Sequence, residues 1–215
     1  MDHSLMDKFR NALGVQGWQC KRFKIDKFSE ADVDNFLLMA YSKEVEDRRS
    51  TAILDEATRE KIAKAAKWLT GDYKPGLLLY GGVGNGKTTL AKAICRTIGI
   101  LYDSAYSTDR KGVCRISALE VAKQASNIEA FTRLKSQELL FIDDLGTEPA
   151  NIKSWGNDIS PVTELLYSRY DKLQFTLITS NLNDEELQER YGLRIADRMA
   201  EMFEKLHYSN RSYRR

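Results

Sequence analysis

The sequence predicts a three-layer α/β fold in which helices cover both faces of a parallel β-sheet. Two observations predict this fold. From residue 75 onward, short apolar runs typical of buried strands alternate with longer segments whose apolar residues recur at helical spacing. A glycine-rich turn at 81–86 joins the first apolar run directly to a helical segment, as in a strand–loop–helix unit. Because helices separate the strands, we expect parallel pairing with right-handed crossovers.

The predicted elements follow one another without repeats or low-complexity segments. Ser29 is a candidate N-cap for a helix over 30–47, and a second helix is predicted over 54–69, ended by Gly71. The five predicted strands lie near 77–80, 113–117, 139–143, 175–180 and 205–209. The helices that connect and follow them lie near 88–98, 118–126, 161–170, 184–191 and 194–204.

A helical N-terminal extension over 1–70 therefore precedes an α/β core over 71–215. The first helix of the extension carries apolar side chains at helical spacing, among them Phe36, Leu37 and Tyr41. Such a stripe could dock on a partner helix, which makes the extension a possible partner-binding region. More often a stripe of this kind packs against its own domain, and we expect that role here.

Composition excludes several classes of protein. The 215 residues suit one domain with an appendage, and 42% hydrophobic with 30% charged residues is typical of a soluble globular chain. No apolar run approaches the ~20 residues that span a membrane. The N-terminus lacks the charged start and apolar centre of a signal peptide, so we expect a cytoplasmic protein with no membrane partner.

Cysteine, histidine and net charge predict no specialised site. The three cysteines, Cys20, Cys95 and Cys114, are scattered, and the two histidines, His3 and His207, lie near opposite ends of the chain. This spacing predicts neither a zinc site nor a disulfide framework. The formal net charge of +2 permits nucleic-acid binding without predicting it.

The turn at 81–86 begins the phosphate-binding pattern G-x-x-x-x-G-K-[ST]. Glycine lets the backbone curl closely around an anion, so that successive N–H groups point at phosphate oxygens. The following helix would turn its positive N-terminal end toward the same charge. Lys87 would reach the β- and γ-phosphates, and the Thr88 hydroxyl would ligate Mg²⁺. The residues predicted to bind ATP are Gly81, Gly82, Val83, Gly84, Asn85, Gly86, Lys87, Thr88 and Thr89.

A second apolar run, 139–142, ends abruptly in the carboxylates of Asp143 and Asp144. Open α/β sheets place their ligands at the carboxyl ends of their strands. Asp143 is therefore the predicted Mg²⁺ partner, through water, and Asp144 the group that orients an attacking water. Without the upstream phosphate loop, a solvated acidic turn would be the better interpretation.

Three further polar residues are candidates for catalysis. Asn181 follows the predicted strand over 175–180, and it could hydrogen-bond the γ-phosphate if that strand lies between the first strand and the Asp143 strand. Arg194 and Arg198 share one helical face at i, i+4. A guanidinium can stabilise charge on a transferring phosphoryl group, and it can come from a neighbouring subunit. Taken alone, Asn181 would indicate an ordinary turn after a strand. The two arginines alone would indicate a solvated helix face.

Five motifs in a fixed order make a family resemblance specific. They are Gly-Gly-Val-Gly-Asn-Gly-Lys-Thr, Leu-Phe-Ile-Asp-Asp-Leu-Gly, Ile-Thr-Ser-Asn-Leu, Tyr-Gly-Leu-Arg-Ile-Ala-Asp-Arg-Met and a terminal Ser-Tyr-Arg at 212–214. The chain over about 75–215 resembles the DnaC/DnaI helicase-loader and IstB transposition-helper group of AAA+ ATPases. The resemblance implies a P-loop fold of the AAA+ (ASCE) type, with a five-stranded parallel sheet in the order 5-1-4-3-2.

The resemblance also implies roles for the candidate residues. It implies a Walker A motif at 81–88 and a Walker B motif at 139–144. Asn181 would be the sensor 1 residue, Arg198 an arginine finger that reaches the next subunit's ATP, and Arg194 a helper on the same face. An ATP-dependent homo-oligomer or filament follows from that arrangement.

The chain departs from the AAA+ pattern in three places. Asp144 stands where many AAA+ proteins have Glu, which puts the water-activating role in doubt. Only 34 residues follow Asn181, which is too few for a full helical lid, and Arg211 and Arg214 are weak candidates for a sensor 2 arginine. Residues 1–70 lack the cysteine cluster that some loaders carry, which puts the choice of partner in doubt.

The function that the resemblance implies is that of a DNA replication protein. The expected protein is a slow, oligomer-dependent ATPase that binds Mg-ATP and single-stranded DNA and loads a replicative helicase. Two alternatives remain open. The first is an IstB-like transposition helper that acts with a transposase on duplex DNA, and the second is a nucleotide-gated adaptor with negligible hydrolysis. A small-molecule kinase is disfavoured, because no substrate-binding insertion or lid is evident.

Overall fold

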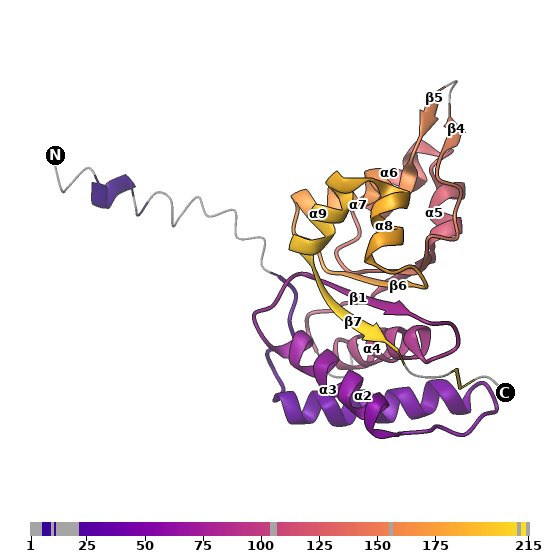
Figure 1. Ribbon diagram of the computed structural model, residues 1–215. Helices are drawn as coiled ribbons and strands as arrows, with labels where there is room; N and C mark the ends of the chain where they lie inside the picture. Colours follow the sequence, from indigo (N-terminus) through magenta and orange to yellow (C-terminus); the bar gives the residue numbers. More distant parts are fainter. Residues whose placement is uncertain are drawn as a thin grey trace.

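A computed structural model describes residues 6–9, 11, 22–103, 107–154, 157–209 and 212–213. In this structure a central parallel sheet separates two layers of helices (Figure 1). Within the described part of the chain, every helix is too short or too polar to cross a membrane.

The sheet contains five strands in the order β2-β3-β6-β1-β7, and each neighbouring pair is parallel. The strands are β1 (Gly76–Gly81), β2 (Cys114–Ser117), β3 (Leu140–Leu145), β6 (Thr176–Ser180) and β7 (Phe203–Tyr208). Numbered among themselves along the chain, they follow the order 5-1-4-3-2 from one edge to the other, so the predicted fold and strand order are confirmed. β6 therefore lies between β1 and β3.

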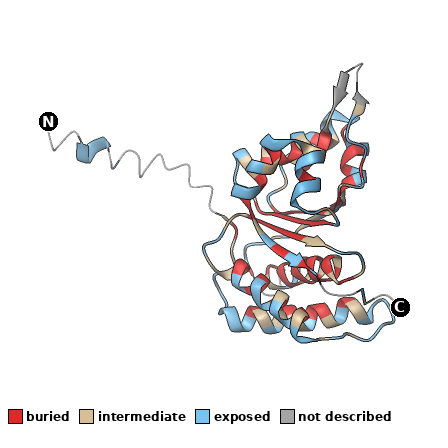
Figure 2. Ribbon diagram, in the orientation of Figure 1, coloured by how far each residue is buried: buried red, intermediate tan, exposed pale blue. Residues whose placement is uncertain are grey.

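Each face of the sheet carries its own hydrophobic core. Successive strand residues point to opposite faces, so Leu77 and Leu79 join one cluster while Leu78 joins the other. The first core is covered by α2 (Glu30–Glu46), α3 (Glu56–Thr70) and α4 (Lys87–Leu101). The second is covered by α5 (Ala118–Gln124), α6 (Ile128–Lys135), α7 (Pro161–Asp171), α8 (Asp184–Tyr191) and α9 (Leu193–Met202). Buried residues accordingly concentrate along the strands and the inner helix faces (Figure 2).

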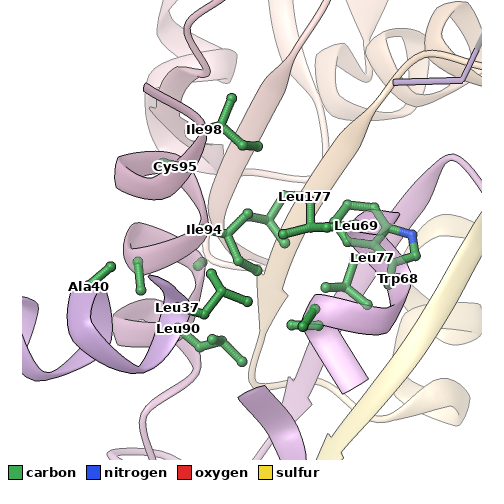
Figure 3. Close-up of a cluster of buried hydrophobic side chains, with 14 of the residues drawn as sticks. Leu37, Ala40, Trp68, Leu69, Leu77, Leu90, Ile94, Cys95, Ile98 and Leu177 are labelled. Carbon is green, nitrogen blue, oxygen red and sulfur yellow. The ribbon is translucent and has the colours of Figure 1, made fainter. Parts of the chain in front are cut away.

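Helices α2 and α3 share the first core with the strands. Figure 3 shows Leu37 of α2 and Leu69 of α3 with Leu77 of β1 and Ile94 of α4 in a single apolar cluster. Local signals start the two helices, since Ser29 forms a capping box with Asp32, and the Asp55 carboxylate accepts the Thr58 N–H at 2.8 Å. One core therefore crosses the sequence boundary at 70/71.

The predicted apolar stripe of α2 divides between two environments. Leu37 and Tyr41 are buried against the rest of the fold, as expected for a packing face. Phe36 is only partly buried, and Met39 is 72% exposed. The outer side of α2 thus keeps apolar surface that the internal core does not use.

Two features of the structure were not predicted from the sequence, and several element boundaries differ by a few residues. The first is α6, a short helix that Asn127 caps by accepting the Ala130 N–H at 3.0 Å. The second is an antiparallel pair of short strands, β4 (Ile152–Ser154) and β5 (Asn157–Ile159). Both are too short for a clear apolar period. The predicted helix over 194–204 ends earlier, at residue 202, because Phe203 already belongs to β7.

A buried arginine joins three segments at one end of the sheet. Arg169 of α7 is fully buried, and its guanidinium donates to the Thr176 hydroxyl at 2.7 Å. It also donates to three backbone carbonyls, those of Gln137 at 2.8 Å, Glu138 at 3.2 Å and Phe175 at 2.5 Å. Burial lowers the pKa of this guanidinium to about 10. The side chain therefore acts as a hydrogen-bonded clamp between α7, β6 and the start of β3.

We expect Arg169→Ala to lower the free energy of unfolding by about 3 kcal/mol or more, because buried acceptors would lose their donors. The measurement is urea denaturation. The control is Arg133→Ala, since Arg133 is exposed on α6, and a change below about 0.5 kcal/mol is expected there. Equal stability of the two variants would contradict the clamp.

Candidate nucleotide-binding site

The loop between β1 and α4 has the backbone conformation that its glycines allow. Gly81, Gly84 and Gly86 have φ values of 119°, 79° and 95°, in the left-handed region. A Cβ atom at Gly81 would lie 2.4 Å from the Tyr208 carbonyl oxygen. Gly86, which has no side chain to cap a helix, is the N-cap of α4. The positive N-terminal end of α4 thus lies at the loop, which suits a phosphate.

Lys87 places its ammonium group at this loop. The side chain is only 5% exposed, and Nζ donates to the carbonyl oxygens of Gly81 at 2.9 Å and Gly82 at 2.5 Å. Nζ also lies 3.3 Å from Oδ1 of Asn85. A positive charge held among neutral carbonyls is suited to binding an anion that enters the loop.

The remaining loop residues differ in their exposure. Val83 is exposed at the loop, whereas Asn85 and Thr89 are buried. The Thr89 hydroxyl accepts a hydrogen bond from Arg48 at 3.4 Å, so its side chain contacts the end of α2. Thr89 could contribute its backbone N–H to a phosphate site, while its hydroxyl serves packing.

The Asp143 carboxylate, near the end of β3, accepts hydrogen bonds from two hydroxyl groups. The Thr88 hydroxyl donates to Asp143 Oδ1 at 3.0 Å, and the Thr179 hydroxyl donates to the same oxygen at 2.6 Å. Carboxylate and hydroxyl oxygens are ligands that Mg²⁺ accepts. The structure therefore brings together the two residues that the sequence predicts as the metal site, and it adds Thr179.

Sequence reasoning missed Thr179. It lies within β6, and β6 pairs with β3. The predicted strand order already placed these strands side by side. A polar residue near the end of the central strand was therefore the feature that could have indicated Thr179. Asn181, the residue that was predicted instead, is exposed beyond the strand. No hydrogen bond joins its side chain to another described residue.

Asp144 adopts an unusual backbone conformation. Its φ is 56°, and a bulge interrupts the pairing of β3 with β6 between Ile142 and Leu145. The Asp144 N–H donates to the Thr179 hydroxyl at 2.9 Å. Thr179 thus fixes both acidic residues, one through its carboxylate and the other through its backbone. The side chain of Asp144 is exposed, as a group that meets solvent water must be.

A second missed cluster supports the loop after β3. Glu148 is 3% exposed, and its carboxylate accepts the Gly146 N–H at 2.9 Å and the Tyr191 hydroxyl. Arg190 lies 3.7 Å from the same carboxylate. Burial and the hydrogen bond to Glu148 raise the pKa of Tyr191, which keeps its hydroxyl a donor. These contacts connect the acidic end of β3 to the end of α8.

Helix α9, which carries Arg194 and Arg198, lies on the opposite side of the sheet from α4 (Figure 1). The Arg198 guanidinium stacks over the rings of Tyr167 at 4.4 Å and Tyr170 at 4.9 Å. Arg194 lies 5.8 Å above the Tyr167 ring. Among the described residues, both guanidinium groups contact these tyrosine rings of α7. The structure therefore does not bring either arginine to the phosphate loop. Arg211 and Arg214 lie outside the described residues.

Comparison with known proteins agrees with this geometry. Residues 77–175 match the model of the ATPase family associated with various cellular activities (AAA). No protein with a curated function matches the sequence.

Three solved structures have a similar fold. A DnaC helicase loader has a TM-score of 0.57 at 19% identity, with 79% of this chain and 98% of that chain covered. DnaI has a TM-score of 0.52 at 20% identity, with 73% and 87% covered. A putative primosome component from Streptococcus pyogenes serotype M3 has a TM-score of 0.57 at 16% identity, with 93% and 99% covered. The chain therefore has the fold of these DnaC- and DnaI-like structures, and residues 77–175 within that fold match the AAA family model.

Proposed function

We propose that this chain is an ATP-dependent replication protein of the DnaC/DnaI type, which binds Mg-ATP and single-stranded DNA and loads a replicative helicase. The meeting of Lys87, Thr88 and Asp143 at the carboxyl edge of the sheet is the observation that carries the nucleotide part of the proposal. The likeness to a DnaC helicase loader and to DnaI supports the replication part.

The site residues divide the work of binding and hydrolysis. Lys87 and the N–H groups of the loop and of α4 would bind the phosphates, and Thr88 with Asp143 would hold Mg²⁺. The metal ion, when bound, would neutralise charge on the transferring phosphoryl group. Asp144 would orient the attacking water, and Asn181 would contact the γ-phosphate. We expect slow hydrolysis, with ATP acting mainly as an assembly switch.

The arginines of α9 would complete the site of a neighbouring subunit. Arg198 is held by two tyrosine rings, which leaves its guanidinium pre-oriented on the surface of the α7–α9 layer. A planar guanidinium suits the charge that spreads over a transferring phosphoryl group. In a ring or filament, Arg198 would reach the neighbour's ATP, and Arg194 would assist from one turn earlier.

The outer face of α2 is our candidate for the helicase contact. A groove of about 930 Å³ lies there, lined mainly by apolar side chains from α2 and α4. Met39 and Ile100 are 72% and 52% exposed in it, and Phe36 forms part of its wall. An apolar groove between helices fits the apolar face of a partner helix.

A second groove, of about 520 Å³, is our candidate for single-stranded DNA. The α3 lysines Lys61, Lys64 and Lys67 line it together with Lys205 and His207 of β7. Glu204 is the acidic residue of the lining, so the groove is net positive. The ring of Tyr73 is also present and 38% exposed. Positive side chains beside an aromatic ring suit the backbone and bases of a single strand.

Arg198→Ala should bind ATP as the wild type does but lose hydrolysis by about 10³-fold or more, because the guanidinium acts on a neighbour's nucleotide. Lys87→Ala should bind no ATP. A mixture of the two variants should recover part of the activity, since each supplies what the other lacks. Steady-state phosphate release measures this, and melting curves control for folding. Absence of recovery at every ratio, with mixed assembly shown, would refute action between subunits.

Met39→Glu with Ile100→Glu should abolish co-purification with the host's replicative helicase, because two charges would enter the apolar groove. ATP hydrolysis should remain. The control is Ile128→Glu, which changes a residue that is 66% exposed on α6, far from the groove in sequence. Retained capture by the double variant would exclude this surface. If the wild type instead captures a transposase and binds duplex DNA, the transposition-helper alternative replaces the helicase loader.

Replacing Lys61, Lys64 and Lys67 together by Ala should weaken binding to an oligo(dT) strand and flatten its salt dependence. Loss of three phosphate contacts should reduce the slope of log K against log salt by about 2. Fluorescence anisotropy over a salt series measures both quantities. Replacing the exposed Lys123, Arg133 and Lys172 by Ala is the charge-matched control. Equal slopes for the two triple variants would exclude the groove.

A further inference from the structure

The outer side of the phosphate loop is held by the C-terminal segment of the chain. The carbonyl oxygen of Tyr208, the last residue of β7, accepts the Gly82 N–H at 3.2 Å. The same oxygen accepts Nδ2 of Asn85 at 3.1 Å. Because Oδ1 of Asn85 also receives the Lys87 ammonium, this side chain links β7 to the predicted phosphate-binding lysine.

Tyr213 makes a second connection from the same segment. Its backbone N–H donates to the Gly84 carbonyl oxygen at 2.9 Å, near the tip of the loop. Its hydroxyl donates to Asp55 Oδ2 at 2.8 Å and lies 3.1 Å from the Thr58 hydroxyl. The other oxygen of Asp55 caps α3 through the Thr58 N–H. One residue therefore joins the phosphate loop to the first turn of α3.

Tyr41 of α2 completes the contact around the loop. A Cβ atom placed on Gly86 would lie 2.7 Å from the Tyr41 hydroxyl and 3.9 Å from Cε2 of Tyr213. Both tyrosines thus flank the N-cap residue of α4. Burial raises the pKa of Tyr41 to about 12, so the hydroxyl stays protonated at neutral pH. The two rings contact the loop from the side of α2 and α3.

These contacts affect the direction of the loop's own donors. In a trans peptide the C=O and the following N–H point in opposite directions. When the Gly84 carbonyl points outward to Tyr213, the Asn85 N–H must point the other way, toward the inside of the loop. A loop with glycines at 81, 82, 84 and 86 loses much freedom when it becomes ordered. External hydrogen bonds that order it beforehand reduce the cost of binding a phosphate.

We propose that Tyr213 is a positioning residue for nucleotide binding, which fastens the C-terminal segment to the phosphate loop and to α3 in the conformation that receives the phosphates. The proposal rests on nucleotide binding at the Lys87 loop. Coupling of this kind is reciprocal, so docking of Tyr213 strengthens nucleotide binding, and nucleotide binding strengthens the docking of Tyr213.

The test uses three full-length variants and one nucleotide series. Tyr213→Phe keeps the ring and the backbone N–H but removes the donor to Asp55. Asp55→Asn keeps an acceptor for the α3 cap and weakens the same link. Tyr102→Phe is the matched control, because Tyr102 is the C-cap of α4, at the end of that helix away from the phosphate loop, and its hydroxyl donates to the Lys24 carbonyl oxygen at 3.4 Å. Dissociation constants for fluorescent ATP and ADP analogues are measured beside melting temperatures without nucleotide.

We expect Tyr213→Phe and Asp55→Asn each to weaken binding of both nucleotides about tenfold, and the double variant to be no weaker than either single one. Tyr102→Phe should bind as the wild type does. In the wild type, saturating ATP should slow hydrogen exchange at the Tyr213 amide, which a purely structural contact would not require.

Wild-type affinity in both single variants would overturn the proposal, as would exchange at the Tyr213 amide that ATP leaves unchanged. These results differ from a failure of the proposed function. If the wild-type chain binds no ATP, both inferences fail. If the wild type binds ATP and Lys87→Ala does not, while Tyr213→Phe binds normally, only the role of Tyr213 is lost.

Discussion

The place of β6 between β1 and β3 determines the geometry of the candidate site. Parallel strands end at the same edge of a sheet, so the loop after β1 and the Asp143 carboxylate near the end of β3 both lie close to the end of β6. The Thr179 hydroxyl occupies that position and donates to Asp143 while accepting the Asp144 N–H. If β6 lay at the far edge of the sheet, Asp143 would lack the second hydroxyl donor on the oxygen that Thr88 also contacts.

The sequence predicted the parts of the site that depend on local pattern. A strand, a glycine loop and a helix in immediate succession predict the position of Lys87 without knowledge of the rest of the chain. Which polar residue of β6 meets Asp143 depends instead on register across the sheet, and a one-residue difference in register moves a side chain to the other face. Thr179 was missed for that reason. The role that we propose for Arg198 would depend on a second subunit, which one chain cannot contain.

Helices α2 and α3 contribute to the stability of the ATPase-like core, which a separate appendage would not do. Leu37, Ile62 and Leu69 are fully or almost fully buried in the same cluster as Leu77 and Leu90. Loss of α2 and α3 would expose that face of the sheet and of α4 to water. The free energy of unfolding would fall by about 25 cal/mol for each Å² of apolar surface exposed. The stripe on α2 could not reveal from sequence alone that its two sides have different neighbours, since both sides are apolar.

The backbone conformation of Asp144 is compatible with a short acidic side chain at this position. At a φ of 56°, side chains with a branch or a long stem are disfavoured, whereas Asp and Asn are enriched several-fold. Where many AAA+ proteins carry Glu, this chain has a residue of positive φ within a bulge, and aspartate is the acid that this conformation favours. The backbone conformation at residue 144 thus restricts which side chains are compatible with it, in addition to any chemical requirement for an acid. A letter-by-letter comparison would score Asp144 as a departure from the AAA+ motif. The local backbone conformation makes aspartate compatible with this position.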